Sequence, residues 1–130
     1  IARCIIRCLK SASLSPKDIG AVCLHGTATV NNDLAEANAV RAVFGSYDVP
    51  CFGIKPQFGH LLGSSALVEV VICSDAVRRR IIPSSLLYGS PDPLCSLNLS
   101  AETGELKSPY ILSLNFGFGG HIAAVIIGKI

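Results

Sequence analysis

Two histidines, His25 and His60, have the sequence surroundings most suited to chemistry in this chain. His25 follows the apolar run 19–24 and precedes the small residues Gly-Thr-Ala-Thr, while His60 lies five positions after Lys55. Loops at the carboxyl ends of strands usually carry the ligand site in open α/β sheets. Two imidazoles and an ammonium group that converge on such an edge could bind and polarise a carbonyl or a carboxylate.

The residues after His25 favour a ligand site there, although a lone histidine at a strand end is more often a hydrogen-bonded structural residue. Thr27 and Thr29 alternate along an extended turn and offer hydroxyls to one face. Small residues beside them let a ligand approach the backbone closely.

Lys55 and Glu69 are expected to form an ion pair. Lysine rarely lies buried without a carboxylate partner, and Glu69 stands inside an otherwise apolar segment that needs one equally. Such a pair could simply brace the loop, which is compatible with a functional role for the neighbouring His60.

The glycine-rich segment Phe116-Gly117-Phe118-Gly119-Gly120 is a further candidate site element. It is not a dinucleotide fingerprint, because that motif requires a helix after its glycines and a strand is predicted here. Glycines flanked by aromatic rings can present backbone N–H groups to a developing oxyanion. A tight turn with packed rings fits the spacing equally well, so both interpretations remain open.

Hydrophobic periodicity predicts the elements that position these residues. Helices are predicted at 1–13, from Asn31 or Asn32 to about Phe44, and at 61–79, and strands at 19–24, 51–54, 110–114 and 122–127. This alternation predicts an α/β domain with a mixed, mostly parallel sheet packed on helices and an antiparallel final pair of strands. The helix at 61–79 is apolar almost all round and is predicted to be central. The irregular segment 81–108 is expected to be anchored by Leu86, Leu87, Leu94 and Leu97.

Composition restricts the class of protein. Half of the residues are hydrophobic and 15% are charged, which indicates that another domain or a partner covers part of the surface. A net charge of +2 predicts neither nucleic acid nor a membrane surface as partner, and charges interrupt every apolar stretch, so no membrane insertion is predicted. The six cysteines lack CxxC spacing and are predicted to be reduced thiols of a cytoplasmic protein, with no metal site.

Three motifs together resemble the C-terminal half of β-ketoacyl-acyl-carrier-protein synthases, which are thiolase-like condensing enzymes of fatty acid and polyketide synthesis. The motifs are His-Gly-Thr-x-Thr from His25, Lys-x-x-x-Gly-His-Leu-Leu-Gly from Lys55 with the later Glu69, and Asn-Phe-Gly-Phe-Gly-Gly-His from Asn115. They occur in the family's order and at its spacing. The resemblance covers the whole chain, so residues 1–130 are predicted to be the ketoacyl synthase C-terminal domain, a thiolase-like half.

The resemblance implies a role for each motif residue. His25, His60 and Lys55 match the family's catalytic residues, and Thr27 and Thr29 match the threonines that contact the phosphopantetheine arm. Phe116 matches the gating phenylalanine whose backbone N–H helps to form the oxyanion hole. Structural support is implied for Glu69, Asp33, Gly117, Phe118 and Gly119.

The implied reaction is the decarboxylative Claisen condensation of malonyl-carrier protein with an acyl group held on a cysteine. The implied partner is an acyl carrier protein, whose phosphopantetheine carries the substrates, and no other cofactor is implied. The intact protein is expected to be a homodimer.

The chain also departs from the family. None of its six cysteines has the small-residue, serine-rich setting of the nucleophile, so the N-terminal half with that cysteine is inferred to be absent and the chain alone to be inactive. Pro56-Gln57-Phe58, Ser64-Ser65-Ala66 and Ile122 replace other residues of the family pattern, which puts substrate choice in doubt.

Two alternatives remain. The first is a non-catalytic partner of a ketosynthase heterodimer, similar to a chain-length factor; retention of both histidines and the lysine argues against it. The second is a thiolase, but the thiolase motif carries a second catalytic cysteine near the glycine turn, where this chain has His121.

Overall fold

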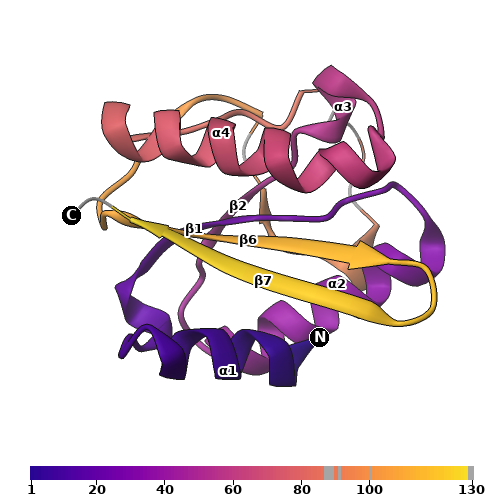
Figure 1. Cartoon of the computed structure of the whole chain (residues 1–130), viewed down its shortest axis with the longest axis horizontal. Helices are drawn as coiled ribbons and strands as arrows, with labels where there is room; N and C mark the ends of the chain where they lie inside the picture. The colour runs from indigo at the N-terminus through magenta and orange to yellow at the C-terminus, as the bar shows by residue number, and fades with distance from the viewer. Residues whose placement is uncertain (87–89, 91, 100, 129–130) are drawn as a thin grey trace.

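A five-stranded sheet forms the centre of the structure, a computed structural model that describes residues 1–86, 90, 92–99 and 101–128 (Figure 1). The strand order is β4-β2-β1-β6-β7. Neighbouring strands are parallel except for β6 and β7, which form an antiparallel hairpin. The strands are β1 (Ile19–Cys23), β2 (Pro50–Phe52), β4 (Asn98–Leu99), β6 (Tyr110–Gly117) and β7 (His121–Gly128). The predicted α/β class, with its mostly parallel sheet, is confirmed.

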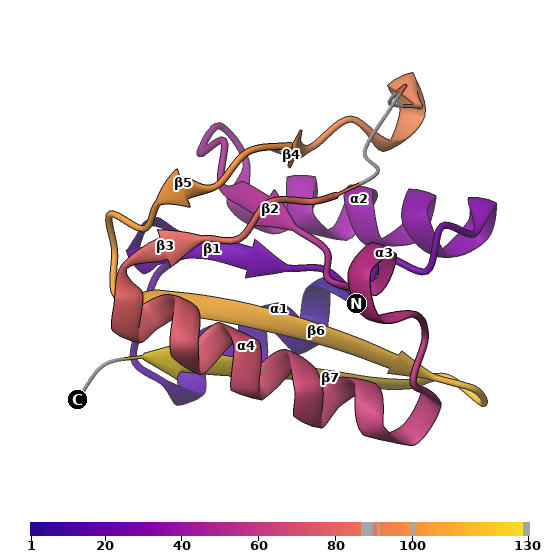
Figure 2. The ribbon, with the colours of Figure 1, turned by 90° about the horizontal axis from the view of Figure 1, so that it is seen from above.

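Helices cover both faces of this sheet (Figures 1 and 2). On one face, α1 (Ala2–Ser11) and α2 (Val30–Phe44) bury apolar side chains such as Ile5 and Val40 against Val22. On the other face, α4 (Ser65–Arg79) buries Cys73 and Val77 in a second core cluster. The buried strand β1 therefore lies between two apolar layers, and its carboxyl end emerges at the edge where His25 lies.

The helix predicted at 61–79 begins later and lies elsewhere than expected. A 3-10 helix (Leu62–Ser64) precedes α4, which covers one face of the sheet instead of occupying the centre of the described chain. Its buried residues recur at helical spacing along one side, whereas Leu67 and Val71 are 68% and 61% exposed on the other. The prediction of a central helix is wrong within the described residues because only one side of α4 meets the sheet.

The segment between Lys55 and His60, expected to be a loop, contains a short helix, α3 (Lys55–Phe58). Pro56 lies in its first turn, where a missing backbone N–H costs no helical hydrogen bond. Gly59 then ends the helix at a φ of 74° and turns the chain towards His60.

The segment 81–108 is more regular than predicted. It contributes β4 to the edge of the main sheet, and β3 (Ile81–Ile82) pairs antiparallel with β5 (Gly104–Glu105). A 3-10 helix (Pro93–Cys95) lies near α2, and the Arg41 guanidinium donates to the carbonyl oxygens of Leu94 and Ser96.

The anchors of this segment differ from those predicted. Leu86 and Leu94 are exposed, and the buried side chains are instead those of Ile82 and Leu106. Leu97 does pack against the core, as predicted, while Leu87 lies outside the described residues. Ile82 and Leu106 belong to β3 and to the stretch after β5, so the small sheet supplies the anchor.

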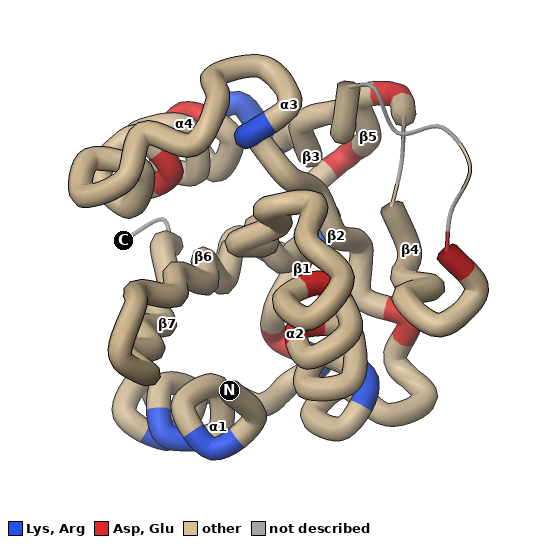
Figure 3. The backbone as a smooth tube through the Cα atoms, turned by 90° about the vertical axis from the view of Figure 1, so that its right-hand side faces the viewer, with Lys and Arg blue, Asp and Glu red and all other residues tan. Residues whose placement is uncertain are grey.

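A stripe of basic residues lies on the exposed side of α1. Arg3, Arg7 and Lys10 are exposed on α1, which carries no acidic residue (Figure 3). In the described part of the chain, no helix is both long and apolar enough to cross a membrane.

Candidate active site at the carboxyl edge of the sheet

His25, His60 and Phe116 converge at the edge where β1 and β6 end. His25 follows β1, His60 follows α3, and Phe116 lies near the end of β6. The ring centroids of His25 and His60 are 5.6 Å apart with nearly perpendicular planes, and those of His25 and Phe116 are 4.9 Å apart. The two histidines singled out in the sequence are therefore direct neighbours.

Backbone hydrogen bonds set the proton position on both imidazoles. The backbone N–H of Phe116 donates to Nδ1 of His25 over 3.4 Å, and that of Leu62 donates to Nδ1 of His60 over 3.3 Å. Because Nδ1 must be unprotonated to accept, the proton of each neutral ring is on Nε2. Both rings can therefore offer an Nε2–H group to a substrate oxygen.

Burial keeps the imidazole of His25 neutral. The pKa of His25 is lowered to about 4, first by burial and then by its electrostatic interactions with Lys55 and His60. Near neutral pH the ring therefore acts as a neutral hydrogen-bond donor and not as a cation.

Glu36 holds the backbone on which His25 stands. Its carboxylate accepts hydrogen bonds from the backbone N–H groups of His25 (2.7 Å) and Gly26 (2.9 Å). Burial raises the pKa of Glu36 to about 7, against the opposing effect of these two donors. Sequence reasoning assigned Glu36 no role in the site. An acid next to Ala37, on the inner face of α2, was the signal that could have revealed it.

The Lys55–Glu69 pairing predicted from the sequence is confirmed. Nζ of Lys55 lies 2.8 Å from Oε1 of Glu69, and both side chains are buried. The second oxygen of Glu69 accepts from the hydroxyl of Ser113 (3.0 Å) and the amide of Asn115 (2.6 Å). Lys55 thus supplies a fixed positive charge next to His25, and its ammonium group is held by the carboxylate.

Thr27 and Thr29 lie on the turn between β1 and α2, as expected. Their hydroxyl oxygens are 2.9 Å apart, and Thr29 is exposed at the start of the helix. Asp33 follows in the first turn of α2, where its carboxylate accepts from the amide of Asn32 (3.0 Å). The charge of Asp33 also acts on His25, where it opposes the lowering of the imidazole pKa.

The glycine-rich segment forms the end of the β6–β7 hairpin, and both strands are longer than predicted. Gly117 pairs with His121, so the loop consists of Phe118, Gly119 and Gly120. Both loop glycines have left-handed φ values, 80° and 83°. Phe116 fits the interpretation of a turn with packed rings, because its ring contacts His25. Phe118 does not fit it, because it is 94% exposed.

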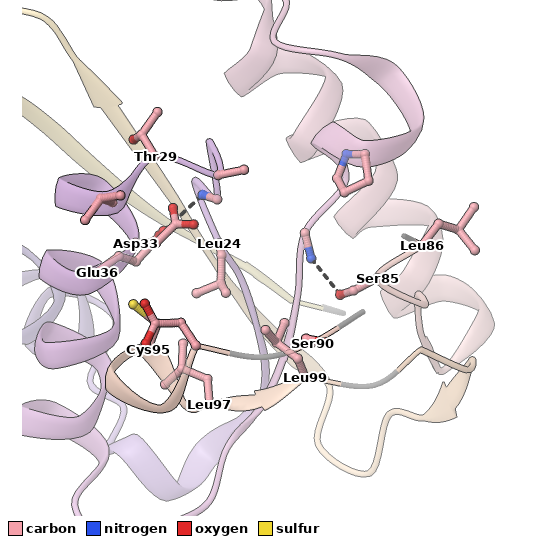
Figure 4. A pocket seen from close by; sticks show the side chains of 16 residues that line it. Leu24, Thr29, Asp33, Glu36, Ser85, Leu86, Ser90, Cys95, Leu97 and Leu99 are labelled. Carbon is pink, nitrogen blue, oxygen red and sulfur yellow. Dashed lines mark hydrogen bonds between the residues drawn. The ribbon is translucent and has the colours of Figure 1, made fainter. Parts of the chain in front are cut away.

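A cavity of about 420 Å³ lies behind the His25 loop (Figure 4). Its lining residues include Thr29, Asp33 and Glu36 as well as Leu86, Leu97 and Leu99. Neither imidazole lines this cavity, so the space beside the two rings, and not the cavity, is where their N–H groups can act. Among the described residues, no group of three or more His, Cys, Asp or Glu side chains could hold a metal ion.

Comparison with known proteins identifies the family. Residues 1–88 match the family described as "Beta-ketoacyl synthase, C-terminal domain". The chain is 34% identical to 3-oxoacyl-[acyl-carrier-protein] synthase 2 of Synechocystis and 32% identical to the tetracenomycin polyketide synthase ketoacyl synthase alpha subunit of Streptomyces glaucescens. These alignments cover 98% and 99% of the chain but 31% of each relative.

A solved structure supports the same assignment. It is described as a type II polyketide synthase acyl-carrier protein in complex with its ketosynthase, and it superposes with a TM-score of 0.94 at 28% identity. The superposition covers 99% of this chain and 32% of that one. The chain therefore belongs to the β-ketoacyl synthase family and corresponds to the C-terminal domain of its members in fatty acid or polyketide synthesis.

Proposed function

We propose that this chain supplies the enolate-stabilising side of a β-ketoacyl-acyl-carrier-protein synthase, as the C-terminal part of the intact enzyme. The observation that carries the proposal is the pair of Nδ1 hydrogen bonds, which leaves an Nε2–H donor on both His25 and His60. Two adjacent neutral donors suit an oxygen that gains negative charge during the reaction.

The reaction proceeds through a carbanion equivalent. The bond between the malonyl α-carbon and its carboxylate breaks, CO₂ leaves, and the electron pair forms an enolate whose oxygen accepts from His25 and His60. The α-carbon then attacks the carbonyl carbon of an acyl thioester, a carbon–carbon bond forms, and the thiolate of the nucleophilic cysteine leaves. That cysteine belongs to another part of the intact protein, so we expect this chain alone to be inactive.

Lys55 acts in this scheme through its charge. The ammonium group is bound to Glu69, and the pKa of His25 is lowered in part by this neighbouring charge. Lys55 therefore keeps His25 in the neutral form that donates from Nε2. Phe116 serves the same ring, because its N–H fixes the tautomer and its side chain packs against the imidazole.

The substrate arrives on a phosphopantetheine arm in this proposal. The adjacent hydroxyls of Thr27 and Thr29 lie on the turn that leads away from His25, where they can bind the amide groups of such an arm. An acyl carrier protein is the partner that delivers it, and no further cofactor is required. The intact protein is proposed to be a cytoplasmic homodimer.

A chain-length-factor-like role is the second candidate, since such a partner would share the fold without catalysis. The buried Lys55–Glu69 pair and the two preset imidazoles favour the catalytic role, because a non-catalytic subunit has no need for either.

Decarboxylation of malonyl-carrier protein by the intact protein tests the proposal. His25→Ala and His60→Ala should each lower the rate by about 10²–10³-fold, the usual effect of removing one donor to a developing oxyanion. Acylation of the nucleophile should be much less affected, since it does not pass through the enolate. His121→Ala, which removes an exposed histidine at the start of β7, is the matched control and should retain activity. A His25→Ala/His60→Ala protein that still decarboxylates at the wild-type rate would refute the assignment.

A further inference from the structure

Ser65 is the first residue of α4, and its side chain contacts the ring of His60. The serine is 5% exposed, and its Oγ lies 3.2 Å from Nδ1 of His60, five residues earlier in the chain. A buried hydroxyl needs a partner, and this imidazole nitrogen provides it. The neighbouring Ser64 differs, because it is exposed and its hydroxyl donates to the backbone carbonyl of Leu61.

The direction of the Ser65 hydrogen bond follows from a second contact. The backbone N–H of Leu62 also points at Nδ1 of His60, over 3.3 Å, and a backbone N–H can only donate. Nδ1 must therefore be an acceptor, and the Ser65 hydroxyl must donate to the same nitrogen. Two donors on one nitrogen exclude the tautomer in which Nδ1 carries the proton.

The two histidines differ in what holds them. His25 is buried and packs against Phe116, whereas His60 is exposed on the chain between α3 and the 3-10 helix. An exposed side chain at such a position has rotational freedom that packing does not remove. The hydroxyl of Ser65, held in the first turn of α4, restricts this rotation of the His60 ring.

We propose that Ser65 is a positioning residue for the reaction, which fixes the orientation of the His60 ring, while the Leu62 N–H sets its Nε2–H tautomer. This inference rests on the proposed function for its effect on rate, but the effect on the ring's orientation stands by itself. Ser65 does not touch the substrate, and its contribution passes entirely through the His60 ring.

The test compares Ser65→Ala with Ser64→Ala in the intact protein. Both remove a serine hydroxyl at the start of α4, but only the first removes a donor to His60. In ¹⁵N-histidine-labelled protein, two-bond ¹H–¹⁵N spectra report the chemical shift of each ring nitrogen, which responds to the hydrogen bonds that the nitrogen accepts. Ser65→Ala removes one of the two donors to Nδ1 of His60, so it should change the Nδ1 shift of His60 and leave that of His25 unchanged. It should also lower kcat for malonyl decarboxylation by about threefold to tenfold, with KM unchanged.

Two comparisons make the result decisive. Ser65→Cys retains a weak donor of similar shape and should restore part of both signals, which a purely packing role would not produce. Ser65→Ala spectra and kcat values equal to those of Ser64→Ala would overturn the inference. A changed Nδ1 shift of His60 in a protein whose decarboxylation is insensitive to His60→Ala would instead refute the proposed function while supporting the role of Ser65 in holding the ring.

Discussion

At the scale of single residues, the site depends on carboxylates that do not face the substrate. Glu36 bonds two successive backbone N–H groups at the turn that carries His25, and Glu69 gathers Lys55, Ser113 and Asn115. The sequence pointed to Lys55 and Glu69 because both are charged residues in apolar surroundings. It could not reveal Ser113 and Asn115, whose partner is more than forty positions away and is reached only once α4 lies over β6.

Glu36→Gln should destabilise the protein by about 1–3 kcal/mol. The amide oxygen of glutamine can accept from only one of the two backbone N–H groups, and the other N–H then faces the NH₂ group and lacks an acceptor. The loss should depend on pH. The folded-state pKa of Glu36, about 7, lies above its ordinary value of 4.5, so its contribution to stability is complete below pH 4.5 and is lost as the pH rises through 7. The difference between wild type and variant should therefore narrow over this range.

The contribution of His25 to stability changes with pH in the opposite direction. Its folded-state pKa, about 4, lies below its ordinary value of 6.5, so its contribution is present above pH 6.5 and is lost as the pH falls through 4. The two contributions oppose each other in wild type between pH 4.5 and 6.5, whereas Glu36→Gln retains only that of His25. Urea unfolding across this range measures the free energy of unfolding of wild type and of Glu36→Gln as a function of pH. A difference between the two free energies that does not change with pH would contradict the raised pKa of Glu36.

At the scale of elements, prediction succeeded where a buried run of residues is bounded by turn-forming residues, as at β1 and α2. It failed where apolar character had another cause. Leu61 and Leu62 continue the apolar pattern of α4 backwards, yet the Leu62 N–H is used by His60 and the helix starts only at Ser65. The short strands β3, β4 and β5 have two residues each, too few to show any periodicity.

The β6–β7 turn makes a prediction at this scale. Gly120 has a φ of 83° and a Cβ added there would meet no atom within 4 Å, so Gly120→Ala tests conformation without a steric clash. The substitution should cost about 1–2 kcal/mol, the penalty of a left-handed conformation for an L-residue. Gly63→Ala, which also enters open space but without a left-handed φ, is the matched control. Equal thermal stabilities of the two variants would show that the turn does not need the glycine conformation.

At the scale of the whole molecule, several large apolar side chains are exposed on the described surface. Leu67 and Val71 lie four residues apart on the outer side of α4, both more than half exposed, and Phe118 is almost fully exposed at the hairpin turn. The chain spans about a third of the length of its relatives. The expectation from composition, that another domain or a partner covers part of the surface, agrees with this distribution of apolar side chains.

This surface should make the isolated chain self-associate. Each leucine or valine side chain that leaves water contributes about 1.5–3 kcal/mol, so a stripe of two is enough to drive weak association. Leu67→Glu/Val71→Glu should therefore shift the isolated chain towards monomer in sedimentation experiments, while in the intact protein the same change should lower stability because it would bury two charges. Leu94→Glu, at an equally exposed leucine outside α4, is the control and should alter neither. An isolated wild-type chain that sediments as a monomer at high concentration would show that the outer side of α4 does not drive self-association.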